Sequence, residues 1–343
     1  MSSTSLAVRP SDPSRPQGAT RTGRALTVVI VTYNSVGVIG PCLASVCADL
    51  LPAIVAGDAE VIVVDNASAD GTAALVADAF PAVRLIHSPG NVGYAAAINA
   101  GIVAAPPTGA VLVLNPDIRL APGAVDALRH APCGRIGVTV PRLLDPDGIV
   151  SSSIRREPGV GRALADALLG GPRAARLRLG ETVTEPAAYA HFHEVEWASG
   201  AALLITRDCL DDVGPFDESF FLYSEETDFM LRARDAGWRV AFVPSATVVH
   251  RGGEMSTSAP LWSMRTLNRV RLQRRRHGRV STALFLAVSM LGEGGRAATG
   301  RDVSRRAVLD LCRRGPAVVA GGPPPRVPRS WNPPLSDTVH GPR

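Results

Sequence analysis

Four short apolar runs separated by helix-like stretches constrain the fold of this chain more strongly than any other feature of its sequence. The runs are rich in Val, Ile and Leu and cover residues 26–31, 61–64, 83–86 and 111–114. Stretches with helical spacing lie between them, at residues 36–50, 72–80 and 94–104. Strands that are apolar on both faces and alternate with helices are typical of a buried parallel sheet. We therefore predict an α/β fold with a mostly parallel central sheet flanked by helices.

The second half of the chain is less regular than the first. Its pattern predicts helices at residues 159–178 and 226–236, and strands at residues 195–206, 238–243 and 247–250. We expect these elements to complete the same domain rather than to form an independent one.

Polar residues follow three of the four predicted strands at the point where each strand ends. Residues 32–34 (Thr-Tyr-Asn) follow the first strand, Asp65 follows the second, and residues 115–117 (Asn-Pro-Asp) follow the fourth. Ligands bind beyond the carboxyl ends of the strands in such sheets, so we predict the site there. Asp117 could link a hard divalent cation to a diphosphate, although Pro-Asp also occurs in ordinary turns. Asp65 could accept a hydrogen bond from a base or a ribose.

A glycine-containing segment at residues 90–94 (Gly-Asn-Val-Gly-Tyr) opens the third predicted helix. Glycines before a helix N-terminus allow close approach of the backbone, and we expect them to leave amide groups free for phosphate oxygens. GxGxxG does not follow the first strand, and GxxxxGK[ST] cannot occur in a chain without Lys. These observations argue against nicotinamide-dinucleotide and P-loop sites.

The segment at residues 214–228 combines five acidic residues with aromatic ones, just before and inside a predicted helix. Asp228 is spaced to pair with Arg232 one helical turn later. The helix dipole stabilises Glu225 and Glu226 as anions, yet each raises the pKa of the other, which leaves one as a usable proton acceptor. The alternative is a solvated helix N-terminus without a chemical role.

His250 ends the last predicted strand and precedes Arg251. An isolated His is usually structural, but this imidazole could complete a metal site that Asp117 begins. Spacing alone does not show that the two side chains meet.

The formal net charge of +5 is unevenly distributed, because sixteen Arg and four acidic residues occur from Met255 onward. The five Cys show neither CxxC nor Cys/His ligand spacing, so we expect reduced thiols. The first 24 residues lack the apolar region of a secretory signal. The longest apolar run, residues 283–291, is shorter than the roughly 20 residues of a spanning helix. We expect no transmembrane segment.

Taken in chain order, these residues resemble the motifs of the family-2 glycosyltransferases, inverting enzymes of the GT-A type fold, and within them the bacterial rhamnosyltransferase-like branch. The resemblance extends from about Leu26 to His250. It rests on residues 31–34, 64–71, 91–94 with Asn99, 115–117, 199–201 and 216–228. Each segment is common alone, but their combination in this order is specific.

The resemblance implies a role for each candidate site residue. Glu226 would be the general base, and Glu225 would hold the acceptor. Asp117 would be the acid of the DxD-type motif that binds Mg²⁺ or Mn²⁺, with His250 as a late metal ligand. The nucleotide-diphospho-sugar donor would be bound by Thr32, Tyr33, Asn34, Asp65, Asn66, Gly93, Tyr94, Asn99 and Asn115. The acceptor, a glycan or lipid-linked glycan, would contact Glu225, Trp197 and Gly200.

Two positions depart from the family pattern. The first acid of the DxD motif is Asn115 here, as is usual in this branch, which leaves coordination to Asp117 alone or with His250, through waters. Glu-Glu stands at residues 225–226 where Glu-Asp is commoner, so either carboxylate could be the base.

The resemblance implies a single-displacement transfer in cell-wall or polysaccharide synthesis, with dTDP-rhamnose as the preferred donor. Two alternatives remain open. A nucleotidyltransferase that makes the activated sugar would share the strand-end site, but its usual phosphate-binding Lys residues are absent. A non-catalytic scaffold could bind glycan or membrane with the same fold, but the acids at residues 117, 225 and 226 are intact.

The chain is predicted to have four regions. They are a disordered arm at residues 1–24, a catalytic domain at 25–255, a basic helical extension at 256–314 and a disordered Pro-rich tail at 315–343. The catalytic domain would divide into a nucleotide-sugar half at residues 25–120 and an acceptor half at residues 121–255.

Arginines in the basic extension stand beside apolar residues. The arginines are Arg265, Arg269, Arg271, Arg274, Arg275, Arg276 and Arg279, and the apolar residues are Leu261, Trp262, Met264, Leu267, Val270 and Leu272. A helix with an apolar stripe flanked by Arg is typical of a segment on an anionic bilayer. A solvated basic helix is the alternative, and no nucleic-acid-binding motif accompanies the arginines. We predict a cytoplasmic enzyme attached peripherally to the inner face of the plasma membrane through this helix, without a nucleic-acid partner.

Overall fold

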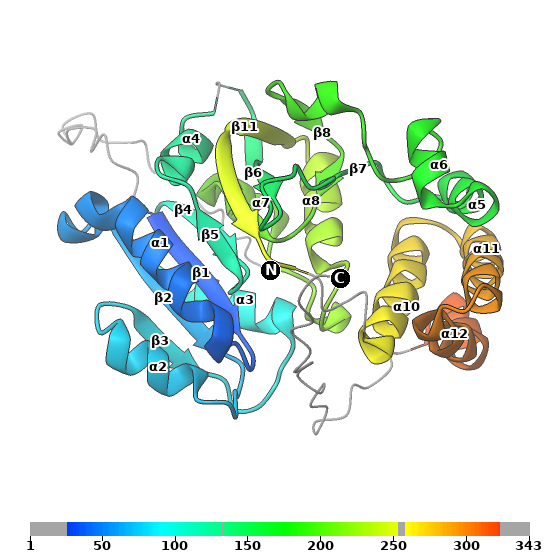
Figure 1. Ribbon diagram of the computed structural model, residues 1–343, viewed down its shortest axis with the longest axis horizontal. Helices are drawn as coiled ribbons and strands as arrows, with labels where there is room; N and C mark the ends of the chain where they lie inside the picture. Colours follow the sequence, from blue (N-terminus) through cyan, green and yellow to red (C-terminus); the bar gives the residue numbers. More distant parts are fainter. Residues whose placement is uncertain (1–25, 132–133, 253–257, 323–343) are drawn as a thin grey trace, which may run out of the picture.

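A computed structural model describes residues 26–131, 134–252 and 258–322 of the chain. Its centre is one mixed sheet of nine strands with helices on both faces (Figure 1). The four predicted strands and three predicted helices of the first half all form: β1 (Leu26–Thr32), α1 (Val36–Val55), β2 (Ala59–Asp65), α2 (Thr72–Ala79), β3 (Arg84–His87), α3 (Tyr94–Ala104) and β4 (Ala110–Leu114). The predicted α/β fold with a mostly parallel central sheet is confirmed.

The two faces of β1 are covered by different helices, because successive side chains of a strand point to opposite sides. Val29 and Val31 belong to a core that includes α3, whereas Val28 and Ile30 belong to a second core that includes α1. By length and composition alone, α1 could span a membrane. Its buried residues, such as Leu43, pack in the second core, as in the core helix of a globular domain.

The second half of the chain adds five strands to the same sheet. The order is β3-β2-β1-β4-β10-β6-β11-β5, with β8 paired to β11. The elements up to the last strand are β5 (Ile118–Leu120), α4 (Ala124–Arg129), β6 (Ile136–Leu144), β7 (Ile154–Arg155), α5 (Val160–Leu169), α6 (Gly171–Arg176), η1 (Pro186–Tyr189), β8 (His193–Val195), β9 (Trp197–Ala198), β10 (Ala202–Ile205), α7 (Arg207–Val213), η2 (Glu218–Phe220), α8 (Glu225–Asp235) and β11 (Arg239–His250).

Several predicted elements of this half are divided or joined. The helix predicted at residues 159–178 is broken into α5 and α6 at Gly170, whose φ is 77°. The strand predicted at residues 195–206 is divided among β8, β9 and β10. The two strands predicted at residues 238–250 form one strand, β11, with a register shift between Val243 and Thr247.

The sheet brings the predicted site residues to one edge. β1 lies between β2 and β4, parallel to both, and the register places Thr32 beside Asp65. β5 pairs antiparallel with the end of β11, so that Ile118 lies opposite His250. His250 is thereby carried to the residues that follow β4, although they are far away in the sequence.

Three helices follow the sheet: α10 (Ala259–Arg276), α11 (Arg279–Ala298) and α12 (Asp302–Ala320). They pack together at the end of the molecule opposite α2 and β3 (Figure 1). The prediction that disorder begins at residue 315 is wrong for residues 315–320, which are helical. A Cβ at Gly315 would lie 2.6 Å from Leu286 Cδ1, so the glycine lets α12 approach α11 closely. The predicted arm at residues 1–24, and the tail from residue 323, lie outside the described residues.

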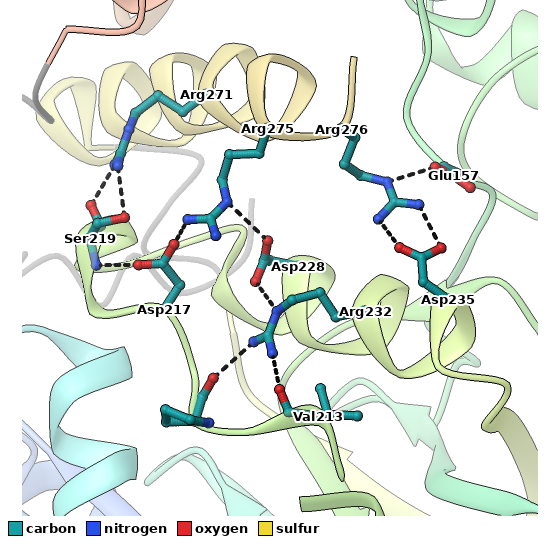
Figure 2. A network of polar contacts seen from close by, with 11 residues as sticks. Glu157, Val213, Asp217, Ser219, Asp228, Arg232, Asp235, Arg271, Arg275 and Arg276 are labelled. Carbon is teal, nitrogen blue, oxygen red and sulfur yellow. Dashed lines mark hydrogen bonds and ion pairs between the residues drawn. The ribbon is translucent and has the colours of Figure 1, made fainter. Parts of the chain in front are cut away.

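The predicted bilayer contact through α10 is wrong, because this helix already has protein partners. Its buried apolar residues are Leu261, Trp262, Leu267, Val270 and Leu272. Its arginines reach across to α8 and the segment before it (Figure 2). Arg276 pairs with Glu157 and Asp235, and Arg275 pairs with Asp217 and Asp228. What looked like a surface helix is a structural one.

Candidate active site

Thr32 and Asp65 meet where β1 and β2 end. The hydroxyl of Thr32 donates to Asp65 Oδ1 at 3.0 Å, and the backbone N–H of Ser68 donates to Asp65 Oδ2 at 3.0 Å. Asp65 is only 3% exposed. Each carboxylate oxygen can accept a further hydrogen bond, so the group remains able to bind a donor from a ligand. Its role toward a base or ribose stays a prediction.

Tyr33 and Asn34 form the turn that follows β1. Asn34 has a φ of 50°, and its side-chain oxygen accepts from the N–H of Ala69 at 2.9 Å. The backbone N–H of Tyr33 donates to Ser35 Oγ at 3.2 Å, and Tyr33 is partly exposed. Asn34 therefore ties the end of β1 to the turn after β2, beside Asp65.

Asn66 organises the loop that precedes α3. Its side-chain oxygen accepts from the N–H of Val92 at 2.9 Å, and its amide donates to Asn91 Oδ1 at 3.0 Å and to the carbonyl of Gly93 at 3.3 Å. The N–H of Gly93 donates to Asn91 Oδ1 at 3.2 Å. Asn66 thus uses its polar atoms on the protein, and two loop amides are occupied.

The third amide of this loop is occupied as well. The N–H of Tyr94 donates to the carbonyl of Phe221. The amides of Val92, Gly93 and Tyr94 are therefore not free for phosphate oxygens, contrary to the prediction for these three groups. Gly93 serves packing instead, because its φ is 94° and a Cβ there would lie 2.6 Å from the ring of Phe221.

Asp117 and His250 meet, as the metal-site prediction required. His250 Nε2 lies 3.3 Å from Asp117 Oδ2 and 3.4 Å from Asn115 Nδ2. Asp117 Oδ2 also accepts from the N–H of Gly252 at 2.8 Å. Burial raises the pKa of Asp117, but the hydrogen bond and charge of His250 and the Gly252 amide outweigh this and lower it overall. Asp117 is therefore an anion at neutral pH.

Asn115 is oriented by Tyr94, whose hydroxyl donates to Asn115 Oδ1 at 2.7 Å. Burial raises the pKa of Tyr94 well above its ordinary value, and the charges of Glu225, Glu226 and Asp117 raise it further. Tyr94 therefore remains a neutral donor. Tyr94 also links two parts of the site, because its hydroxyl binds Asn115 and its backbone N–H binds the carbonyl of Phe221, four residues before Glu225.

The residues around Asp117 fit a divalent cation that takes most of its ligands from elsewhere. The described residues contain no group of three or more His, Cys, Asp or Glu that could hold a metal. Mg²⁺ is commonly held by one or two carboxylates together with water and substrate phosphates. An ionised Asp117 beside His250 meets that requirement once a diphosphate is bound.

Glu225 and Glu226 begin α8 with oxygens that have no partner. The Oε2 atom of each is buried without a hydrogen bond in the described part of the chain. Burial and the charge of Glu226 raise the pKa of Glu225. Burial also raises the pKa of Glu226, against the opposing effect of backbone amides and Arg265. Carboxylates left in this costly state are typical of functional sites, and the pair can accept a proton.

Gly200 lies against Glu226. A Cβ on Gly200 would lie 2.9 Å from Glu226 Cγ and 3.0 Å from Glu226 Cβ, so a glycine here leaves Glu226 in its present position. Trp197, in contrast, is 8% exposed in the core, and its indole N–H donates to the carbonyl of Arg156 at 2.9 Å. This placement removes the basis for predicting Trp197 as an acceptor contact.

Asn99 has a structural role in place of the predicted donor contact. Its side-chain oxygen accepts from the N–H of Phe216 at 3.0 Å, and its amide donates to the Phe216 carbonyl at 2.9 Å and to Glu218 Oε1 at 3.0 Å. Asn99 therefore fixes the acidic segment that leads into α8. Asp228 pairs with Arg232 at 2.7 Å, which confirms the predicted i,i+4 contact.

Two arginines that were not predicted from the sequence to belong to the site also lie near it. Arg155 in β7 and Arg265 in α10 interact electrostatically with Glu226. No local motif marks either residue, because each is far from Glu226 in the sequence and is brought there by the pairing of β7 with β9 and the packing of α10.

Comparison with known proteins agrees with this geometry. A model of the family described as "Glycosyl transferase family 2" matches residues 27–131, from β1 through α4. A model described as "Glycosyl transferase family group 2" matches residues 183–300, which include Glu225 and Glu226.

One characterised relative is similar over most of the chain. It is the N-acetylglucosaminyl-diphospho-decaprenol L-rhamnosyltransferase of Mycobacterium tuberculosis, with 36% identity over 237 residues. The match covers 66% of this chain and 75% of the relative.

Solved glycosyltransferases share the fold at low sequence identity. The mannosyltransferase PcManGT from Pyrobaculum calidifontis, solved with GDP-Man and Mn²⁺, superposes with a TM-score of 0.51 at 18% identity, covering 86% of this chain and 81% of that one. GalNAc-T7, solved with UDP, GalNAc and Mn²⁺, gives a TM-score of 0.55 at 15% identity, covering 89% of this chain and 59% of that one.

Proposed function

The chain belongs to glycosyltransferase family 2, and on that premise we propose that it is an inverting rhamnosyltransferase that uses dTDP-rhamnose and a lipid-linked glycan acceptor in cell-envelope synthesis. The observation that carries the proposal is the pair Glu225 and Glu226, whose buried Oε2 atoms have no partner among the described residues. Tyr94 links the segment before this pair to Asn115, which lies next to His250. The mycobacterial relative, named for transfer of L-rhamnose to a diphospho-decaprenol acceptor, supports this choice of sugar and acceptor. Membership of a glycosyltransferase family sets aside the nucleotidyltransferase alternative.

The proposed reaction is a single displacement. Glu226 accepts the proton of the acceptor hydroxyl, and that oxygen forms a bond to the anomeric carbon of the donor sugar. The bond from the anomeric carbon to the diphosphate oxygen breaks at the same time, and its electron pair leaves with the diphosphate. Inversion at the anomeric carbon follows. Glu225 positions the acceptor, and Gly200 positions Glu226.

A divalent metal, Mg²⁺ or Mn²⁺, is part of the proposal. Asp117 and His250 would hold it, and it would offset the charge of the departing diphosphate. Two solved proteins of the same fold were obtained with both Mn²⁺ and a nucleotide or nucleotide sugar, which supports the assignment.

A donor panel tests the proposed reaction. Purified protein is incubated with individual nucleotide sugars, a lipid-linked N-acetylglucosamine acceptor, and Mg²⁺ or Mn²⁺, and nucleotide release is measured with and without a chelator. We expect release from dTDP-rhamnose that needs both acceptor and metal. Turnover of a different donor would overturn the rhamnose assignment, and full activity in chelator would overturn the metal.

We also propose peripheral attachment to an anionic bilayer through the α5–α6–α11 surface, in place of α10. α5 packs against both α6 and α11. The exposed large apolar residues here are Leu164, Leu168 and Leu169 on α5, Val280, Leu284 and Leu291 on α11, and Leu177 and Leu179 just after α6. Arg173 and Arg176 are exposed on α6 and form no ion pair with any residue that the structure describes. Exposed apolar side chains and unpaired guanidinium groups on packed helices suit the interface of an anionic membrane.

Sedimentation with phosphatidylcholine vesicles, with or without phosphatidylglycerol, tests this surface. We expect binding that requires the anionic lipid, weakens with salt, and is reduced by combining Leu168→Ser with Leu284→Ser. Val55→Ser with Val103→Ser is the matched control, since these residues are 80% and 84% exposed on other helices. Absence of vesicle binding at low salt would refute the assignment. A protein that is a dimer in solution and becomes a monomer with the same two substitutions would also refute it, because the surface would then be a dimer interface.

A further inference from the structure

Two arginines beside Glu226 carry positive charge that no carboxylate of the described chain neutralises through an ion pair. We infer that Arg155 and Arg265 form a binding site for the phosphate groups of the acceptor, so that the enzyme selects acceptors whose sugar is linked through phosphate or diphosphate. The inference rests on the proposed function and adds to it how the acceptor is recognised.

Arg265 differs from the other arginines of α10. Arg269, Arg271, Arg274, Arg275 and Arg276 each bond to a carboxylate, a hydroxyl or a carbonyl of the protein. The described structure gives Arg265 no such bond. Its guanidinium lies over the ring of Trp262, with Cζ 5.1 Å from the centroid, and its side chain is partly exposed. Burial and the charges of Arg269 and Arg155 lower the pKa of Arg265 to about 10, which still leaves it charged at neutral pH.

Arg155 is held in place but not neutralised. Its Nη1 atom donates to the carbonyl of Ser152, and to that of Ile154 at 3.0 Å, which fixes the direction of the side chain. Burial lowers the pKa of Arg155, partly against the nearby charge of Glu181. The Glu181 carboxylate is bound instead by Arg269, which donates to it from both terminal nitrogens.

The other acids near α10 are also engaged. Glu293 accepts from Arg296 at 2.7 Å and from the indole of Trp262 at 3.0 Å. Asp166 lies near Arg269 and Arg296, and burial together with the charge of Glu181 raises its pKa. Charged groups that are partly desolvated without a partner are costly, and a bound anion would remove that cost.

The position of the two arginines distinguishes acceptor phosphate from donor diphosphate. Arg155 lies opposite Trp197 in β9, the strand that precedes Gly200, and Gly200 packs against Glu226. Asn268, on the same helix as Arg265, binds the carbonyls of Leu222 and Tyr223 just before α8. Asp117, in contrast, pairs with His250. The donor diphosphate belongs with the proposed metal at Asp117. In an acceptor whose sugar carries a phosphate at its anomeric carbon, that phosphate lies across one sugar ring from the attacking hydroxyl. An anion site next to the base therefore fits the acceptor.

Paired acceptors and direct binding test the inference. The first arm compares a farnesyl-diphosphate-linked N-acetylglucosamine with octyl N-acetylglucosaminide, which lacks phosphate, as acceptors for wild type, Arg265→Gln and Arg155→Gln. Each variant should lose roughly 10- to 100-fold in kcat/KM toward the diphosphate acceptor, the range for a lost hydrogen bond between charged groups, and little toward the neutral one. Arg274→Gln is the matched control, because its guanidinium binds the carbonyl of Val319.

The second arm measures farnesyl diphosphate and dTDP binding by calorimetry, without turnover. We expect both variants to weaken farnesyl diphosphate binding and to leave dTDP binding unchanged. Weakened dTDP binding with farnesyl diphosphate unaffected would move the arginines to the donor site. Equal losses on both acceptors with a shifted pH profile would mean that they only tune Glu226, and either result overturns the inference. If no acceptor is glycosylated, the proposed function fails, and the binding arm still decides the arginine site.

Discussion

The contact between Gly200 and Glu226 gives the most direct test of the proposal that Glu226 is the catalytic base. Gly200→Ala adds one methyl group at a position 2.9 Å from Glu226 Cγ and 3.0 Å from Glu226 Cβ. Carbon atoms pack best at about 3.5–4.0 Å, so the Glu226 side chain must move by roughly 0.5–1 Å. The contacted atoms, Cβ and Cγ, are close to the backbone, so they cannot move aside as easily as the terminal carboxylate could.

The displacement should reduce catalysis more than it reduces stability. Gly200 is not among the glycines with positive φ, so alanine can adopt its backbone conformation. A misplacement of about 1 Å at a reacting group can cost about 10²-fold in rate. We therefore expect kcat to fall by about 10- to 100-fold for Gly200→Ala, with donor KM little changed.

Steady-state kinetics and thermal unfolding of the variant separate these effects. Gly40→Ala is the control, because a Cβ at Gly40 meets nothing within 4 Å and this position lies in α1. The control should keep wild-type kcat, and its melting temperature should not fall. A Gly200→Ala enzyme with wild-type kcat and pH profile would refute Glu226 as the base that Gly200 accommodates.

Four further substitutions probe the site and the helix that begins with Glu225 and Glu226. Asp117→Asn should abolish most metal-dependent activity while the circular dichroism spectrum stays native, because a neutral amide is a poor partner for a hard dication; near-normal turnover would contradict this. Glu226→Gln should lower kcat by roughly 10²–10⁴-fold with dTDP affinity unchanged in calorimetry. Because the pKa of the Glu225–Glu226 pair is raised, wild-type activity should be lost as pH falls, at a pH above the usual glutamate range. Glu225→Gln should move this loss of activity to lower pH. If Glu225→Gln lowers kcat more than Glu226→Gln does, the two residues exchange their proposed roles. Asp228→Ala should destabilise the fold by about 2 kcal/mol in urea unfolding, because the hydrogen bond from Arg232 and the ion pair with Arg275 are lost; an unchanged midpoint would show that these contacts contribute nothing.

The parallel half of the fold could be predicted because its signals are local. Each apolar run of β1, β2 and β4 ends at its own polar residues, and parallel strands bring such ends to one edge. Asp117 and His250 could be proposed as partners from their residue types alone. Their contact depends on the pairing of β5 with the end of β11, and β5 has no counterpart among the predicted strands.

The roles of polar residues in loops could not be predicted, because they depend on partners from other elements. Asn66 and Asn99 stand in motifs that suggested donor binding, but their side chains bind the loop before α3 and the segment before α8. A buried amide side chain needs several partners, and the protein itself supplies them. Sequence shows that such a residue is polar and not whether its partner is a ligand or the chain.

The basic helix illustrates the same limit and also explains how the site is completed. The carboxylates that bind α10 come from residues distant in sequence, so its arginines looked like a surface stripe. Arg275 binds Asp228 in the first turn of α8, and Arg276 binds Asp235 at the end of α8 (Figure 2). α10 is therefore held along the helix that begins with Glu225 and Glu226. Because the same helix carries Arg265, these ion pairs also help to hold the backbone of Arg265 relative to α8.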